Sequence, residues 1–213
     1  MIRGGDDLER LYFLDDGILG VKRTSLGDEV FLRSVKRYEY AARHVKPGDI
    51  VLDCACGSGY GSRILLEAGA SQVVGVDNDP VTIQYARKHY AQKGLSFRCE
   101  DMQGLHLPYD YFNLVVSIET IEHIQEGETF LKYVYRLLRN GGKAVVSTPI
   151  AEKTGRNEAN PYHVHEYTEQ DFRKLVESVF DKAEYYVPTD SDMPLRLTDQ
   201  KTIGLIFAVG GKA

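Results

Sequence analysis

A run of small residues between two apolar stretches, VLDCACGSGYG at 51–61, constrains the fold more than any other feature of the sequence. The spacing predicts a strand that ends at Asp53, followed by a turn in which Gly57, Gly59 and Gly61 leave the backbone open to a ligand. Asp77 stands 20 residues after Gly57, at the tip of the next predicted strand. A carboxylate there can accept hydrogen bonds from both hydroxyls of a ribose, which predicts a nucleoside-binding crevice.

The rest of the chain alternates between short apolar runs and helical patterns, which is typical of an α/β domain built on a parallel sheet. Strands are predicted at 49–55, 72–77, 95–101, 112–118 and 143–149, and two last strands, of undetermined direction, at 183–188 and 202–211. Helices are predicted at 29–45, 60–68, 80–92, 120–123, 127–138 and 169–179. We expect one domain over 1–213, with an N-terminal helical cap at 1–48, a cofactor-binding core at 49–149 and a substrate side at 150–213.

Composition excludes several classes of protein. The 213 residues carry 26 Lys and Arg against 31 Asp and Glu, so the net charge of −5 offers no general attraction for nucleic acid or anionic membranes. No apolar run approaches the roughly 20 residues of a spanning helix, and the charged start MIRGGDDLER does not resemble a secretory signal. With three cysteines, these features favour a cytoplasmic protein that is not inserted in a membrane.

The charge near the turn indicates which nucleoside binds. Loops that hold the pyrophosphate of a dinucleotide read G-x-G-x-x-G, but here the third position is Ser62 and an acid, Asp53, stands just upstream. An acid would repel a diphosphate and would suit a ligand with an amino group and a positive sulfonium. The cofactor indicated is S-adenosylmethionine. A nicotinamide-dependent oxidoreductase and a non-catalytic binding module stay as alternatives.

The segment from Val51 to Pro149 resembles the class I S-adenosylmethionine-dependent methyltransferases, whose motifs it carries in order. The resemblance implies a Rossmann-like, doubly wound α/β sheet of seven mostly parallel strands in the order 3-2-1-4-5-7-6, with the last strand antiparallel. It also implies a set of cofactor residues. Asp53, Cys56, Gly57, Ser58 and Gly59 would hold the methionine part, Asp77 the ribose, and Asn78, Asp101 and Met102 the adenine.

The segments SIETIEHI at 117–124 and NPYHVHEYT at 160–168 resemble the small-molecule branch of that family. That branch includes ubiquinone-pathway O-methyltransferases and methyltransferases of sugar and glycoconjugate clusters. Neither the [DNS]-P-P-[YFW] motif nor the Pro-Cys nucleophile of nucleic-acid methylases follows the fourth strand. We therefore expect a small-molecule acceptor and no nucleic acid, with a hydroxyl oxygen as the first choice and a nitrogen or carbon acceptor left open. A homodimer is neither indicated nor excluded.

Three acceptor-side residues share one helical face if a helix begins at 119. Glu119, Glu122 and His123 fall at i, i+3 and i+4, next to the expected methyl donor. Two carboxylates and an imidazole can bind a divalent metal that orients a hydroxylated substrate and lowers the pKa of its hydroxyl. In the alternative interpretation Glu119 faces the methionine end of the cofactor and His123 only packs.

Histidines are also candidates for the base that removes the hydroxyl proton. His163 and His165 alternate in an extended stretch and would point to the same side, and His123 is a third candidate. Metal ligation by His163 or His165, together with Glu119 or Glu122, is also open. Loop histidines that only fix the start of the next helix are the other alternative. Arg37 and Tyr38 match an Arg-Tyr pair of the glycoconjugate group, which implies that Arg37 pairs with the cofactor carboxylate and Tyr38 closes over the methionine. In the alternative interpretation they are a solvated cation and an aromatic residue on the helix face.

Overall fold

The computed structural model describes residues 12–14, 17–19, 25–101, 106–188, 195–196 and 204–213. Within these residues, eight strands form one sheet in the order β5-β4-β3-β6-β7-β10-β8-β9. The strands are β3 (Ile50–Cys54), β4 (Gln72–Asp77), β5 (Leu95–Cys99), β6 (Phe112–Ile118), β7 (Leu138–Ile150), β8 (Lys182–Val187), β9 (Leu195–Arg196) and β10 (Gly204–Gly211).

The predicted topology is confirmed. The seven predicted strands are β3 to β8 and β10, and they lie in the order 3-2-1-4-5-7-6. β3 to β7 are parallel, whereas β10 is antiparallel to both of its neighbours, β7 and β8. The two-residue strand β9, which the sequence pattern does not predict, adds an antiparallel edge next to β8.

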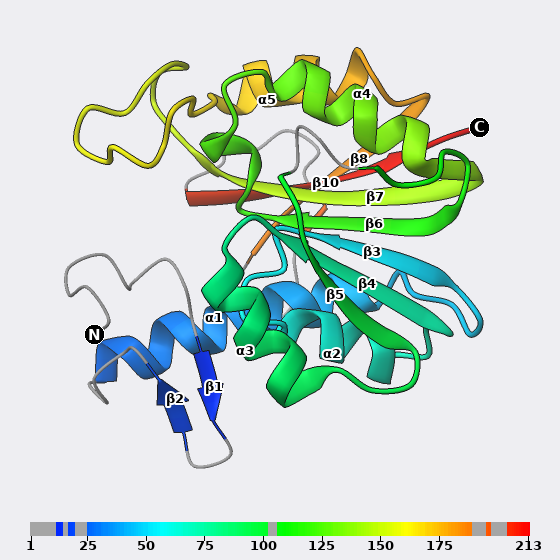
Figure 1. Ribbon diagram of the computed structural model, residues 1–213. Helices are drawn as coiled ribbons and strands as arrows, with labels where there is room; N and C mark the ends of the chain where they lie inside the picture. The colour runs from blue at the N-terminus through cyan, green and yellow to red at the C-terminus, as the bar shows by residue number, and fades with distance from the viewer. Residues whose placement is uncertain (1–11, 15–16, 20–24, 102–105, 189–194, 197–203) are drawn as a thin grey trace.

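Helices cover both faces of the sheet (Figure 1). One face carries α1 (Ser25–Ala42), α2 (Tyr60–Glu67) and α3 (Pro80–Tyr90), and the other carries α4 (Gly127–Leu137) and α5 (Glu169–Glu177). Alternate side chains of each central strand enter opposite cores: Leu52 faces the α4 and α5 side, and Val51 faces the α1 to α3 side. Burial on both faces explains why these strands are continuous apolar runs.

Local capping chemistry sets the starts of two helices where the sequence predicts them. Asp79 accepts hydrogen bonds from the backbone N–H groups of Val81 and Thr82, and Pro80 occupies the first turn of α3. Thr168 accepts from the N–H of Asp171 at the start of α5. These bonds satisfy donors that have no partner inside a helix, which is why Asp and Thr are favoured at such positions.

Other boundaries differ from the predictions. Strands β1 (Tyr12–Leu14) and β2 (Gly17–Leu19) form an antiparallel hairpin in the segment expected to be a helical cap. The predicted helix at 120–123 is a short 3-10 helix, η1 (Ile121–His123), because Glu119 adopts a left-handed backbone with φ of 49° that ends β6. β7 begins at Leu138, before its predicted start at 143, and its pairing with β6 shifts register between Phe112 and Leu114.

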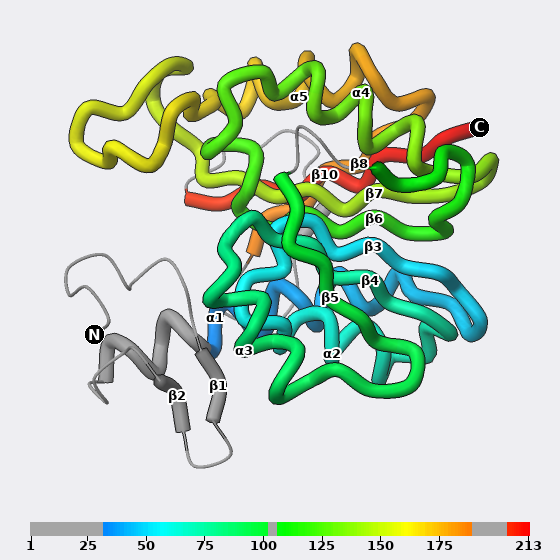
Figure 2. Tube along the Cα trace, in the orientation of Figure 1, coloured from blue at the N-terminus to red at the C-terminus, as the bar shows by residue number. Residues whose placement is uncertain are grey.

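The strand order reverses between β3 and β6, and open sheets of this kind bind ligands outside the carboxyl ends of the strands at that point. The glycine turn follows β3 and η1 follows β6, so both lie at this edge of the sheet, together with the end of β4. The chain after β7, yellow in Figure 2, runs from 151 to 167 as a long excursion beyond the end of the sheet. None of the helices in the described residues has the length and apolar character needed to cross a membrane.

Candidate active site

The turn between β3 and α2 is compact on one side and open on the other. Gly59 has φ of 92°, and a Cβ atom there would lie 2.8 Å from the ring of Phe97, so only glycine fits. Gly57 has φ of 52°, and no atom of the described residues lies within 4 Å of the place where a Cβ would stand. Cys56 and Ser58 are buried in the turn. The open side at Gly57 is therefore where a ligand can approach the backbone.

Asp77 lies against this turn, as the sequence spacing predicts. One of its carboxylate oxygens accepts from the N–H of Gly57 at 3.0 Å, and the other accepts from the N–H of Asp79 at 3.0 Å. Asn78 and Asp101, expected at the adenine, are exposed beyond β4 and β5. Met102 lies outside the described residues.

Asp53 is enclosed by protein and does not face the open side of the turn. It is fully buried, and its two oxygens accept from the hydroxyls of Tyr38 at 3.1 Å and Ser62 at 2.6 Å. Burial raises the pKa of Asp53 to about 7, and the bonds from Ser62 and Tyr38 oppose that rise. Ser62, which replaces the third glycine of the dinucleotide pattern, therefore donates a hydrogen bond from α2 to Asp53.

Arg37 and Tyr38, the Arg-Tyr pair expected at the cofactor, lie on α1 and contact other side chains of the protein. Arg37 forms an ion pair with Glu119, and Tyr38 donates to Asp53 and packs edge-to-face on Tyr60. Glu119 stands at the end of β6, where its N–H is 3.1 Å from both the carbonyl oxygen and the side-chain oxygen of Ser147. Burial raises the pKa of Glu119, and the Arg37 guanidinium opposes that effect.

Glu122 is a buried carboxylate with one oxygen unused. Its Oε2 accepts from the hydroxyl of Thr148 at 3.0 Å, whereas Oε1 has no partner among the described residues. The side chain is only 1% exposed, and burial raises the pKa of Glu122 to about 8. A buried carboxyl oxygen without a partner is costly, so Oε1 of Glu122 is a candidate ligand atom for a bound group.

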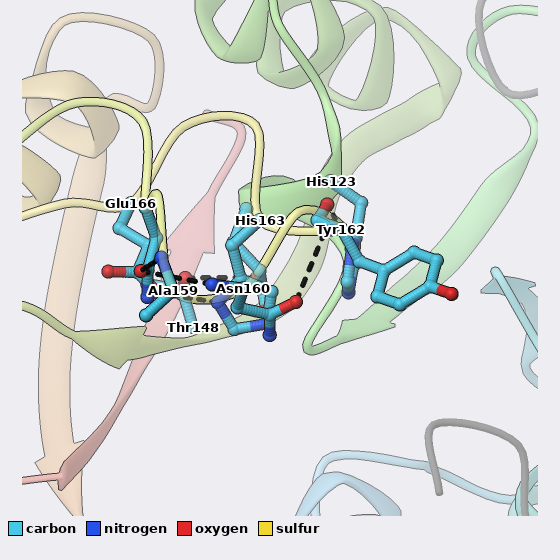
Figure 3. Close-up of polar contacts among 9 residues, drawn as sticks. His123, Thr148, Ala159, Asn160, Tyr162, His163 and Glu166 are labelled. Carbon is cyan, nitrogen blue, oxygen red and sulfur yellow. Dashed lines mark hydrogen bonds and ion pairs between the residues drawn. The ribbon is translucent and has the colours of Figure 1, made fainter. Parts of the chain in front are cut away.

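Two imidazoles, those of His123 and His163, lie beside Glu122. Each has one ring nitrogen already engaged, and Figure 3 shows the two rings with their partners Tyr162 and Glu166. Nδ1 of His123 is 2.9 Å from the carbonyl oxygen of Tyr162, and Nδ1 of His163 is 2.5 Å from a carboxylate oxygen of Glu166. Glu122, His123 and His163 each offer one ligand atom, and these atoms all lie within 4.8 Å of one another. The structure thus groups His163 with two of the three predicted metal ligands, while Glu119 pairs with Arg37.

His165 contributes differently from His163. Its backbone N–H donates to the carbonyl of Glu122 at 3.1 Å, and its ring packs 4.7 Å from that of Tyr167. Sequence reasoning missed Glu166 and Thr148, which orient His163 and Glu122. The sole sequence signal for Glu166 is a carboxylate three residues after a candidate histidine, and nothing in the sequence indicates Thr148.

Comparison with known proteins agrees with this arrangement. Residues 52–146 match the methyltransferase domain family. A Mycolicibacterium smegmatis protein named "Probable S-adenosylmethionine-dependent methyltransferase" is 33% identical over 138 residues, which are 63% of this chain and 52% of that protein. The ubiquinone biosynthesis O-methyltransferase of Coxiella burnetii is 33% identical over 103 residues, 47% of this chain and 44% of that protein. The chain spans about half the length of these relatives.

A solved structure gives the same fold. A Haloferax volcanii protein, solved in complex with the Trm112 methyltransferase activator, superposes with a TM-score of 0.73 at 21% identity, covering 86% of this chain and 92% of that one. The family match and the named relatives support a class I S-adenosylmethionine-dependent methyltransferase domain at residues 52–146, and the solved structure shows the same fold. S-adenosylmethionine is the cofactor of these methyltransferases, so the predicted class and cofactor are confirmed.

Proposed function

We propose that the protein transfers a methyl group from S-adenosylmethionine to a hydroxyl oxygen of a small molecule. The observation that carries the choice of a hydroxyl is the buried Glu122 with its unused oxygen, beside His123 and His163. A neutral amine already carries the nucleophilic lone pair, whereas a hydroxyl is a weak nucleophile unless its proton is removed as oxygen attacks. The named function of the ubiquinone biosynthesis relative supports the same choice. Nitrogen and carbon acceptors remain alternatives.

For the cofactor, we propose that Asp77 binds the ribose hydroxyls next to the open backbone of Gly57. Its carboxylate already contacts the turn, so both ribose oxygens would meet a fixed acceptor. The methionine part would lie along the turn toward Arg37 and Glu119, and the adenine toward Asn78 and Asp101. The full proposed set is Asp53, Cys56, Gly57, Ser58, Gly59, Asp77, Asn78, Asp101, Met102, Glu119, Arg37 and Tyr38, of which Asp53 and Tyr38 would act from behind the turn.

For the acceptor, we propose that Glu122, His123 and His163 hold a divalent cation. The Tyr162 carbonyl and the Glu166 carboxylate engage Nδ1 of each ring, which leaves both Nε2 atoms for a ligand, the arrangement usual around metal-bound histidines. A bound cation would supply Lewis acidity that lowers the pKa of the acceptor hydroxyl. Glu119, expected as a third ligand, would instead hold Arg37 at the mouth of the crevice.

A second way to remove the proton is favoured by the contact between His163 and Glu166. A carboxylate on Nδ1 orients the imidazole and stabilises its protonated form, so His163 could act as a general base without a metal. His123 lacks such a carboxylate, because its Nδ1 faces a carbonyl oxygen. His165 is the weakest of the three candidates, because its ring packs on Tyr167.

The test measures transfer of radiolabelled methyl from S-adenosylmethionine to a panel of catechols, sugars and amines. We expect hydroxyl acceptors to be labelled, activity to fall at least about tenfold with a chelator, and Mn²⁺ or Zn²⁺ to restore it. Glu122→Gln should lose the metal response, whereas Glu67→Gln, an exposed residue paired with Arg63, is the matched control. Labelling of amines alone would contradict the proposal, and metal-independent transfer lost in His163→Asn would favour the general base.

The extent of the domain, the location of the protein and the absence of a nucleic-acid partner are proposed as well. We infer one methyltransferase domain over 1–213 with its cap at 1–48 and its substrate side at 150–213, a cytoplasmic location, and no nucleic-acid partner. Net negative charge supports the absence of nucleic acid. A nicotinamide-dependent oxidoreductase would need NAD binding, and a non-catalytic module would bind S-adenosylhomocysteine without any labelled product.

A further inference from the structure

The buried carboxylate of Asp53 connects three elements behind the cofactor turn. It stands at the end of β3, accepts from Ser62 of α2 at 2.6 Å, and accepts from Tyr38 of α1 at 3.1 Å. Both of its oxygens accept from protein hydroxyls, and the residue is fully buried. Its charge and geometry act on the turn that it supports.

The ring of Tyr38 also packs directly against the backbone of Gly61. A Cβ atom on Gly61 would lie 2.2 Å from atoms of the Tyr38 ring, so the ring rests directly on the backbone at the start of α2. The ring also packs edge-to-face on Tyr60, with ring centroids 5.5 Å apart. Tyr60 and Gly61 are the first residues after the glycine turn, and both are therefore fixed by α1.

The neighbouring residue of α1 contacts the end of the adjacent strand β6. Arg37 pairs with Glu119 at the end of β6, while Tyr38 reaches Asp53 at the end of β3. These strands are adjacent and lie on the two sides of the point where the strand order reverses. One turn of α1 thus bridges the two strand ends that border the cofactor crevice, although α1 lies outside the matched domain at 52–146.

We propose that Tyr38 is a positioning residue for cofactor binding: it fastens α1 to Asp53 and Gly61 and so holds the glycine turn in its binding shape. Because a rigid turn loses little conformational freedom when ligand binds, loosening it lowers affinity without removing any ligand contact. The proposal goes beyond the acceptor chemistry proposed above and relies only on cofactor binding in the crevice.

The experiment compares two tyrosines of the same helix. Tyr38 and Tyr40 are both buried, but the hydroxyl of Tyr40 has no partner among the described residues. We expect Tyr38→Phe to weaken S-adenosylhomocysteine binding about tenfold by calorimetry, and Tyr40→Phe to change it less than about twofold. Circular dichroism and the melting temperature establish that each variant is folded.

A second pair of variants tests the ring contact and includes a rescue. Gly61→Ala should weaken binding about tenfold in the wild-type background, because the added methyl displaces the ring. In the Tyr38→Ala background the same methyl has room, so it should cost less than about twofold. If the contact only stabilised the fold, losing it would lower the melting temperature, and Gly61→Ala would have the same effect on affinity in both backgrounds.

Hydrogen exchange separates failure of this proposal from failure of the cofactor assignment. Without ligand, amides of residues 57–62 should exchange faster in Tyr38→Phe than in Tyr40→Phe. If wild type does not bind S-adenosylhomocysteine, the cofactor assignment falls and the role in binding falls with it, whatever the exchange rates. If wild type binds, the positioning role alone is overturned by affinity in Tyr38→Phe within about twofold of wild type, by an equal loss in Tyr40→Phe, or by equal costs of Gly61→Ala in both backgrounds.

Discussion

Asp53 and Asp77 end neighbouring strands, yet their surroundings give them different tasks. Asp77 is bonded by backbone N–H groups next to the open side of the turn, so its carboxylate can serve a ligand. Asp53 is enclosed by hydroxyl donors, and burial raises its pKa to about 7. Asp53 therefore lies on the protein side of the glycine turn, which supports the proposal that it acts on the cofactor from behind the turn.

The pH dependence of stability tests the burial of Asp53. Its pKa rises from 3.8 to about 7 on folding, so the folded state holds this proton more tightly than the unfolded chain does. The resulting stabilisation is complete below about pH 4 and is lost as the pH rises through about 7. Between about pH 5 and pH 8, wild type should lose roughly 2.5 kcal/mol of unfolding free energy relative to Asp53→Asn.

Urea unfolding of both proteins at several pH values makes this comparison. Asn is nearly isosteric and does not titrate, so other carboxylates cancel in the difference. A difference that stays constant with pH would contradict the buried, proton-binding Asp53.

At the scale of elements, capping decides how the substrate side is held. Thr168 caps α5 and also accepts from Thr154, in the loop that carries His163. Thr168→Ala should lower the free energy of unfolding by about 1 kcal/mol, because it leaves the N–H of Asp171 without its partner. Urea unfolding measures the change, with Ser178→Ala at the other end of α5 as the comparison. An unchanged midpoint would mean that the cap contributes nothing.

Element order was predictable because each parallel strand is a buried apolar run and each crossover helix carries its own start and stop residues. The contact between Asp77 and Gly57 followed for the same reason, since neighbouring parallel strands end at the same edge. Hairpin β1–β2 and the short strand β9 escaped prediction because so few residues carry no distinctive period. The left-handed backbone of Glu119 likewise has no sequence signal, and the helix that follows it is the short 3-10 helix η1, which begins at Ile121.

Contacts between distant segments account for what the sequence could not predict in the site. His163 meets Glu122 and His123 because the loop after β7 folds back over the end of β6. Tyr38 meets Asp53 because α1 packs on α2 next to β3. Such pairings are set by tertiary packing, and the residue types alone leave many partners open.

For the whole molecule, the central claim is that the crevice between the ends of β3, β4 and β6 binds an adenosyl sulfonium cofactor through Asp77. The most direct test is calorimetric titration of wild type and Asp77→Ala with S-adenosylhomocysteine, with NAD as the competing ligand. We predict that wild type binds S-adenosylhomocysteine and not NAD, and that Asp77→Ala binds at least about a hundredfold more weakly while remaining folded. NAD binding by wild type, or unchanged affinity in Asp77→Ala, would contradict the claim.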